Sequence, residues 1–67
     1  MILVNGNPLR CDPHLTIRDV LLELDIDPET AGIAVAVDRE IATRRDWPTR
    51  VLEDGARVEI VTATQGG

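Results

Sequence analysis

Apolar and polar positions alternate over the first twelve residues in the way expected of a β-hairpin. The apolar run Ile2–Val4 meets Asn5-Gly6, a dipeptide that favours the positive φ values of a tight hairpin turn. Leu9–Asp12 then alternates between apolar and polar residues, as a strand with one solvated face does. We therefore expect a hairpin over residues 1–12.

The next segment has the period of an amphipathic helix. Four apolar residues at spacing i, i+3, i+4 and i+7 share one face, namely Ile17, Val20, Leu21 and Leu24. Thr16 is a favourable N-cap residue, and Asp19 suits the positive end of a helix. Asp27-Pro28 is expected to end the helical segment, because the residue before a proline avoids helical geometry.

Three further stretches predict strands. Ile33–Val37 is a continuous apolar run typical of an interior strand, and Ile41–Thr43 fits a short edge strand after a turn. A turn signal at Asp54-Gly55 precedes the last strand, residues 57–63, in which Val58 and Ile60 face one way.

The order hairpin, helix, strand, short strand, strand predicts an α+β fold of the β-grasp (ubiquitin-like) type. One helix has one apolar face, and a mixed sheet of four to five strands offers one face for it to cover. A right-handed crossover is expected to lead from the hairpin through the helix to a parallel strand. The final strand should lie inside the sheet. We expect one domain over residues 1–67, globular over 1–63 with a flexible Gly-Gly tail over 64–67.

Composition and charge narrow the classes of function. A domain of 67 residues buries only about 60% of its unfolded surface, which favours binding or carrying over catalysis in a buried cleft. The net charge of −5 argues against nucleic acid as a partner. The chain shows neither a long apolar run nor a signal peptide, so we expect a cytoplasmic protein without membrane contact.

Few side chains offer catalytic or metal-binding chemistry. Cys11 is the single cysteine and is expected to be a small buried hydrophobe, while His14 should be solvated in a turn. One cysteine and one histidine give no metal-ligand spacing, and no glycine-rich loop can hold a phosphate. Trp47, the only aromatic residue, is expected to cover one end of the core. We therefore expect no catalytic residue, no metal and no bound cofactor.

The C-terminus carries the clearest chemical signal. Gly66 and Gly67 have no side chains, so this end can thread a narrow channel and deliver its carboxylate to a reacting centre. A carboxylate is a poor electrophile and must first be activated, normally as an acyl-adenylate.

An apolar surface is expected beside this tail. Val61 and Ala63 face away from the side of Val58 and Ile60 and are therefore predicted to be exposed on the open face of the sheet. With Leu3 and Ala34 or Ala36 from neighbouring strands, they predict a docking site for a partner protein.

Three stretches resemble the thiamine-biosynthesis sulfur carrier (ThiS) family, and together they span essentially the whole chain: ILVNGNP, IAVAVDREIATRRDW and LEDGARVEIVTATQGG. The terminal Gly-Gly alone is weakly specific, because ubiquitin-like proteins and the small subunit of molybdopterin synthase share it. The combination with Asp38, Trp47 and the Asp54-Gly55 turn is much more specific.

The resemblance implies a carrier rather than an enzyme. An E1-like adenylating enzyme, itself the binder of ATP and magnesium, would form an acyl-adenylate on Gly67. Sulfur from a donor such as a cysteine desulfurase would replace the AMP and leave a thiocarboxylate, with Gly66 giving access. Thiazole synthase would then receive the sulfur.

Three positions depart from the family pattern. The family commonly has Asn where Asp38 stands, Val-Pro where Ala42-Thr43 stand, and Asp where Ala56 stands. These positions fall at expected turns or an edge, so we expect them to affect partner contacts more than the chemistry of the tail.

Other functions share these features. A sulfur carrier for another pathway, such as molybdopterin or sulfur amino-acid synthesis, would use the same chemistry. A ubiquitin-like protein modifier is a second alternative, although the absence of lysine rules out lysine-linked chains on this protein. A non-covalent interaction module, in which Gly-Gly is incidental, is a third.

Overall fold

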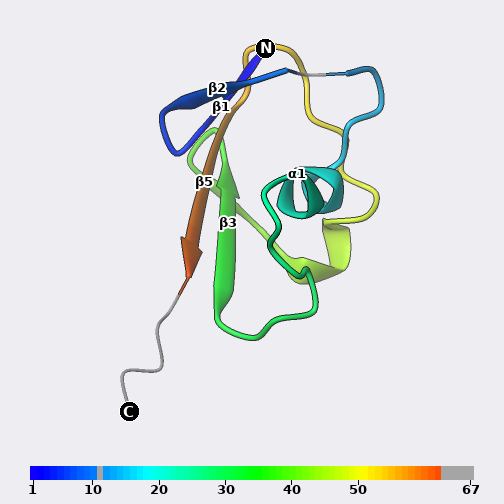
Figure 1. Ribbon diagram of the computed structural model, residues 1–67, viewed down its shortest axis with the longest axis vertical. Helices are drawn as coiled ribbons and strands as arrows, with labels where there is room; N and C mark the ends of the chain where they lie inside the picture. Colours follow the sequence, from blue (N-terminus) through cyan, green and yellow to red (C-terminus); the bar gives the residue numbers. More distant parts are fainter. Residues whose placement is uncertain (11, 63–67) are drawn as a thin grey trace.

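Five strands form one mixed sheet in the computed structural model, which describes residues 1–10 and 12–62 (Figure 1). The elements, in chain order, are β1 (Ile2–Val4), β2 (Asn7–Leu9), α1 (Ile17–Glu23), β3 (Ile33–Val37), β4 (Glu40–Ala42), a 3-10 helix η1 (Arg44–Asp46) and β5 (Arg57–Thr62). The strand order is β2-β1-β5-β3-β4, so the last strand lies inside the sheet, as predicted. It pairs parallel with β1 and antiparallel with β3. Helix α1 packs on one face, which confirms the β-grasp arrangement.

The start of α1 follows the local signals in the sequence. Thr16 is the N-cap, and its hydroxyl accepts a hydrogen bond from the Asp19 N–H at 3.2 Å. The Asp19 carboxylate accepts one in return from the Thr16 N–H at 3.0 Å, which completes a capping box.

The end of α1 differs from the prediction. The helix ends at Glu23, before Asp27-Pro28, because Asp25 adopts a positive φ of 60°. The Ile26 N–H then donates to the Leu21 carbonyl, and the Asp25 N–H donates to the Leu22 carbonyl. This is the Schellman pattern of a helix C-terminus. Leu24 is the C-cap residue and is 40% exposed, whereas the three residues predicted to share its apolar face are buried.

The core lies between α1 and the inner face of the sheet. It contains Ile17, Val20 and Leu21 from the helix and, from the strands, Ile2, Val4, Val35, Val37, Val58 and Ile60. Trp47 is buried and its Nε1 donates to the Ala42 carbonyl at 3.1 Å, while the Arg44 guanidinium stacks on its ring. The predicted core position of Trp47 is thus confirmed.

Two of the family departures lie in this core. Ala42 and Ala56 are only 4% and 6% exposed. They cannot touch a partner directly, so the prediction that the departures act on partner contacts fits only the exposed Asp38 and Thr43.

Several predicted features fall beyond the described residues. Cys11 lies there, as do Ala63 and the predicted tail over 64–67. Among the described residues, no helix has the length and apolar character needed to cross a bilayer.

Candidate functional site

The sheet face turned away from α1, here called the open face, carries exposed aliphatic side chains. Val61 of β5 is 61% exposed and lies opposite Ala34 of β3. Leu3 of β1 is also exposed. These positions follow from alternation, since Val58 and Ile60 on the same strand point into the core. The predicted exposure of Val61 is confirmed, whereas Ala63 lies outside the described residues.

Ile41 extends this face in a way that the sequence analysis did not anticipate. It lies on β4 opposite Ala36 and is 72% exposed, while the next residue, Ala42, is buried opposite Val35. The alternation of exposed Ile41 and buried Ala42 is present in the sequence of this short strand. The face on which Ile41 lies follows only from the pairing of β4 with β3.

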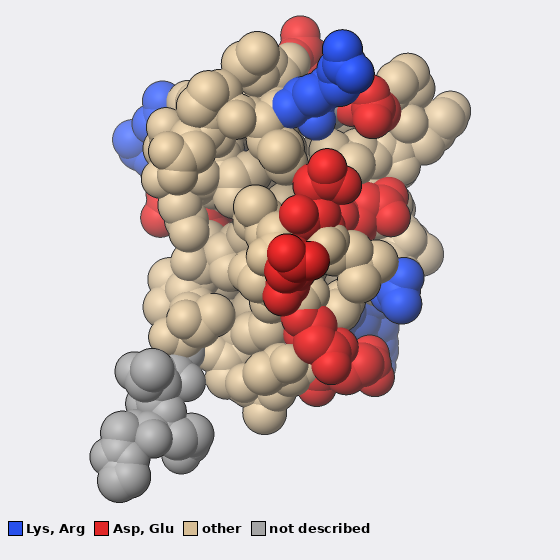
Figure 2. Space-filling model, viewed as in Figure 1, with Lys and Arg blue, Asp and Glu red and all other residues tan. Residues whose placement is uncertain are grey.

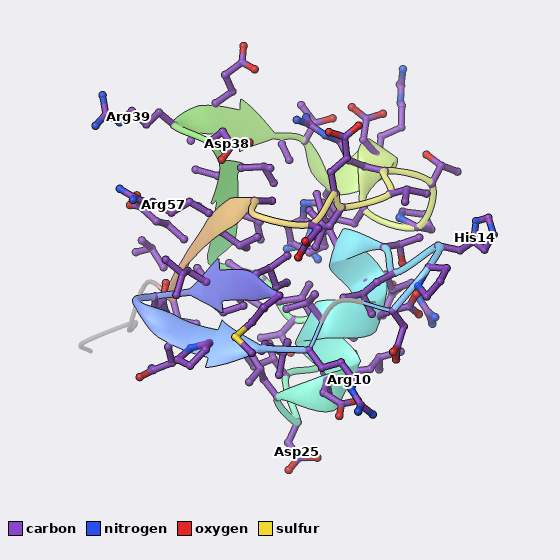
Figure 3. All side chains as sticks on the ribbon, turned by 90° about the horizontal axis from the view of Figure 1, so that it is seen from above. Arg10, His14, Asp25, Asp38, Arg39 and Arg57 are labelled. Atoms are coloured by element: carbon purple, nitrogen blue, oxygen red, sulfur yellow. The ribbon has the colours of Figure 1, made fainter. Side chains whose placement is uncertain are left out.

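Charged residues border the apolar part of the open face. Arg57 and Glu59 of β5 line a shallow hollow of about 390 Å³ together with Leu3, Asn5 and Gly6. Side chains of Arg39 and Arg57 point to the side away from α1 (Figure 3). A partner that docks here meets aliphatic side chains with both signs of charge at the rim.

The turn between β3 and β4 is fixed in an unusual conformation. Asp38 and Arg39 have positive φ values of 50° and 74°. The Asp38 carboxylate accepts the Arg57 N–H at 3.0 Å, and the Asp38 N–H donates to the Arg57 carbonyl at 2.8 Å. Positive φ is unfavourable for a residue as large as arginine. The hydrogen bonds of Asp38 stabilise the turn in which Arg39 adopts it, at the edge of the open face.

Acidic side chains gather on the opposite side of the molecule. Figure 2 shows Asp and Glu concentrated over α1 and the segment that follows it. The acidic residues of this part of the chain are all exposed, namely Asp19, Glu23, Asp25, Asp27 and Glu29. The hydrogen bond from the Thr16 backbone N–H, and then that with the Thr16 side chain, lower the pKa of Asp19 below its ordinary value of 3.8. The open face and the acidic side are therefore electrostatically distinct.

The end of β5 is held by a side chain from the first turn. Asn5 Oδ1 accepts the Ile60 N–H at 2.7 Å, and Asn5 Nδ2 donates to the Ile60 carbonyl at 3.1 Å. These two bonds fix the strand that leads toward Gly66 and Gly67.

The structure also places other side chains that the sequence analysis considered. His14 is exposed, as predicted, and no group of three or more metal-binding side chains occurs within residues 1–10 and 12–62. The backbone N–H of Asp25 donates to the Leu22 carbonyl at the C-terminus of α1. Gly67, the predicted sulfur-carrying residue, and Gly66, predicted to give access to it, lie outside the described residues. The candidate site described here is therefore the open face alone.

Comparison with known proteins assigns the fold to a family. The ThiS family model matches residues 2–67. The curated protein named sulfur carrier protein ThiS from Thermus thermophilus is 36% identical over 67 residues and is covered completely, as is this chain. The protein of the same name from Escherichia coli is 29% identical over 66 residues, which cover 98% of this chain and 97% of that protein.

A solved structure agrees with these relatives. The crystal structure of the thiamine biosynthesis protein (ThiS) from Geobacter metallireducens superposes with a TM-score of 0.75 at 25% sequence identity. The match covers 98% of this chain and 97% of that one. Because the family model and both relatives span nearly the full length, the chain belongs to the ThiS family.

Proposed function

We propose that this chain is a sulfur carrier for thiamine biosynthesis and that Gly67 carries the sulfur. The observation that carries the proposal is a family match reaching from residue 2 to Gly67. The relatives from Thermus thermophilus and Escherichia coli, which bear the name sulfur carrier protein, support it. The open face beside the last strand supports a protein that works by docking to enzymes.

The proposed chemistry takes place at the terminal carboxylate. An E1-like adenylating enzyme, which binds ATP and magnesium, activates Gly67 as an acyl-adenylate and releases pyrophosphate. A persulfide from a donor such as a cysteine desulfurase attacks the carbonyl carbon, and AMP leaves. A thiol then cleaves the remaining S–S bond, so that a thiocarboxylate remains for transfer to thiazole synthase. The carrier is a co-substrate in these steps, and Gly66 leaves room for them.

The open face is the proposed docking surface for the adenylating enzyme. Val61 lies near the end of β5 with Ala34 beside it, Ile41 extends the face, and Ala63 continues the same alternation in sequence. In this arrangement the aliphatic side chains of the sheet supply binding affinity for the partner enzyme, and the C-terminal carboxylate supplies the reacting group.

Reconstitution tests the function directly. The chain is incubated with ATP, magnesium, the adenylating enzyme and a persulfide donor, and its intact mass is measured. We expect the mass gain of one oxygen replaced by sulfur, located on Gly67 by fragmentation. Thiazole synthase should then consume the modified form. A thiocarboxylate that thiazole synthase ignores would assign the carrier to another pathway, and an unmodified chain would refute the carrier proposal.

A further inference from the structure

Strand β1 ends before it has covered the whole edge of β5. It pairs with β5 only through Leu3 opposite Arg57 and Val4 opposite Val58. The Asn5 N–H adds one more bond, to the Val58 carbonyl at 2.8 Å. The chain then turns away, with positive φ values of 51° at Asn5 and 85° at Gly6. The next segment of β5, at Ile60, has no strand on this side.

The side chain of Asn5 takes the place of the missing residue of β1. Its Oδ1 accepts the Ile60 N–H at 2.7 Å, and its Nδ2 donates to the Ile60 carbonyl at 3.1 Å. A carboxamide presents the same donor and acceptor as a peptide group, so it continues the ladder for one more step. Both bonds are partly buried, which shields them from competing water.

This contact is the last that β5 receives from the β1 side within the described residues. Beyond Ile60, β5 pairs within the described residues with β3 alone, through Val61 opposite Ala34 and Thr62 opposite Ile33. The direction in which β5 leaves the sheet therefore depends on β3 on one side and on Asn5 on the other.

We propose that Asn5 is a positioning residue for the reaction at the C-terminus. This inference rests on the proposed function. In the proposed function, Val61 and the terminal glycine must reach two different places on the adenylating enzyme at the same time. Asn5 holds β5 at Ile60, the residue before Val61. Asparagine suits the task because it tolerates positive φ better than other residues with side chains and also supplies both hydrogen-bonding groups.

The variant Asn5→Gly isolates the carboxamide. Glycine adopts a φ of 51° without strain, so the turn is preserved while both bonds to Ile60 are lost. Misplacement of a reacting group by about 1 Å can cost roughly 100-fold in rate, so we expect kcat for adenylation to fall by at least about tenfold. KM should stay within about twofold of the parent value, because the exposed aliphatic side chains of the open face, Val61 and Ile41, are unchanged.

A matched control separates positioning from stability. Asp19→Ala breaks the capping box on α1, on the other side of the molecule, and should also lower the melting temperature. Both variants are assayed with the adenylating enzyme by pyrophosphate release, below their melting temperatures. We expect Asp19→Ala to keep the parent kcat.

The outcomes distinguish this inference from the function on which it rests. If the parent chain is not adenylated, the proposed function fails. If the parent is adenylated and folded Asn5→Gly retains its kcat, or Asp19→Ala loses as much, the positioning role is overturned. Should Asn5→Gly not fold, Asn5→Asp decides: it keeps the acceptor for the Ile60 N–H but loses the donor, and a folded form with parent kcat would also overturn the proposal.

Discussion

At the scale of single residues, carboxylates and amides stabilise the local geometry of this small domain. Asp19 completes the capping box of α1, and Asp38 fixes the turn before β4 through its contact with the Arg57 N–H. Each replaces a backbone partner that would otherwise be missing. The capping box joins residues three apart in the sequence, whereas the Asp38 contact joins residues 19 apart. The loss of either should change stability without changing the fold.

Asp19 should contribute to the acid sensitivity of the protein. Its pKa is lowered in the folded state, chiefly because its carboxylate accepts the hydrogen bond of the Thr16 N–H. The folded state thus binds this proton less readily than the unfolded state. The resulting stabilisation is present above pH 3.8 and is lost as the pH falls through the lower pKa of the folded state. Urea unfolding across the acid range should give a flatter profile for Asp19→Asn than for the parent; identical slopes would contradict this role.

Cys11 should not be the sulfur-bearing atom. Cys11→Ala is expected to cost about 1 kcal/mol or somewhat more if the side chain is buried, as a small truncation does. Intact mass should still show a thiocarboxylate after reconstitution. A folded Cys11→Ala protein that never gains sulfur would give the thiol a role in the transfer.

At the scale of elements, the sequence predicted those parts that depend on local signals. The start of α1 follows from Thr16 and Asp19, and the burial of Val58 and Ile60 follows from alternation. The end of α1 could not be predicted from the apolar pattern. It depends on the positive φ of Asp25, which allows the Ile26 N–H to donate to the Leu21 carbonyl.

The candidate site was predictable only in part, because some of its contacts join residues that are far apart in the sequence. Val61 could be placed on the open face from its own strand, since alternation is local. The contribution of Ile41 depends on the register between β3 and β4, and the contact of Asn5 with Ile60 joins residues at opposite ends of the chain. Such long-range pairings leave no periodic signal in the sequence.

Docking by the open face makes a prediction about β5. Val61→Asp should weaken the complex with the adenylating enzyme by about 1–3 kcal/mol, because a charge would enter a desolvated apolar contact. Leu22→Asp, at an exposed position on α1, is the matched control and should leave the affinity unchanged. Isothermal titration of the folded variants checks both. Equal affinities for Val61→Asp and the parent would exclude this surface.

At the scale of the whole molecule, the fold separates three properties. Apolar side chains fill the space between α1 and the sheet. Acidic residues concentrate over α1 and the segment after it (Figure 2). The open face combines aliphatic residues with charged ones such as Arg57 and Glu59. Strand β5 joins these parts, since its inner residues belong to the core and its outer residues belong to the open face. Only residues 63–65 separate this strand from Gly66 and Gly67 in the sequence.

The removal of Gly67 tests the central claim most directly. The deletion should leave the melting temperature unchanged, because Ile60 is the last core residue within residues 1–10 and 12–62. It should abolish adenylation and sulfur transfer, because one residue of extended chain spans about 3.3 Å and the new carboxylate falls short of the reacting centre. The measurement is the intact mass of the parent and the shortened chain after reconstitution with the adenylating enzyme. We expect sulfur on the parent alone; a shortened chain that gains sulfur at the parent rate would contradict the account.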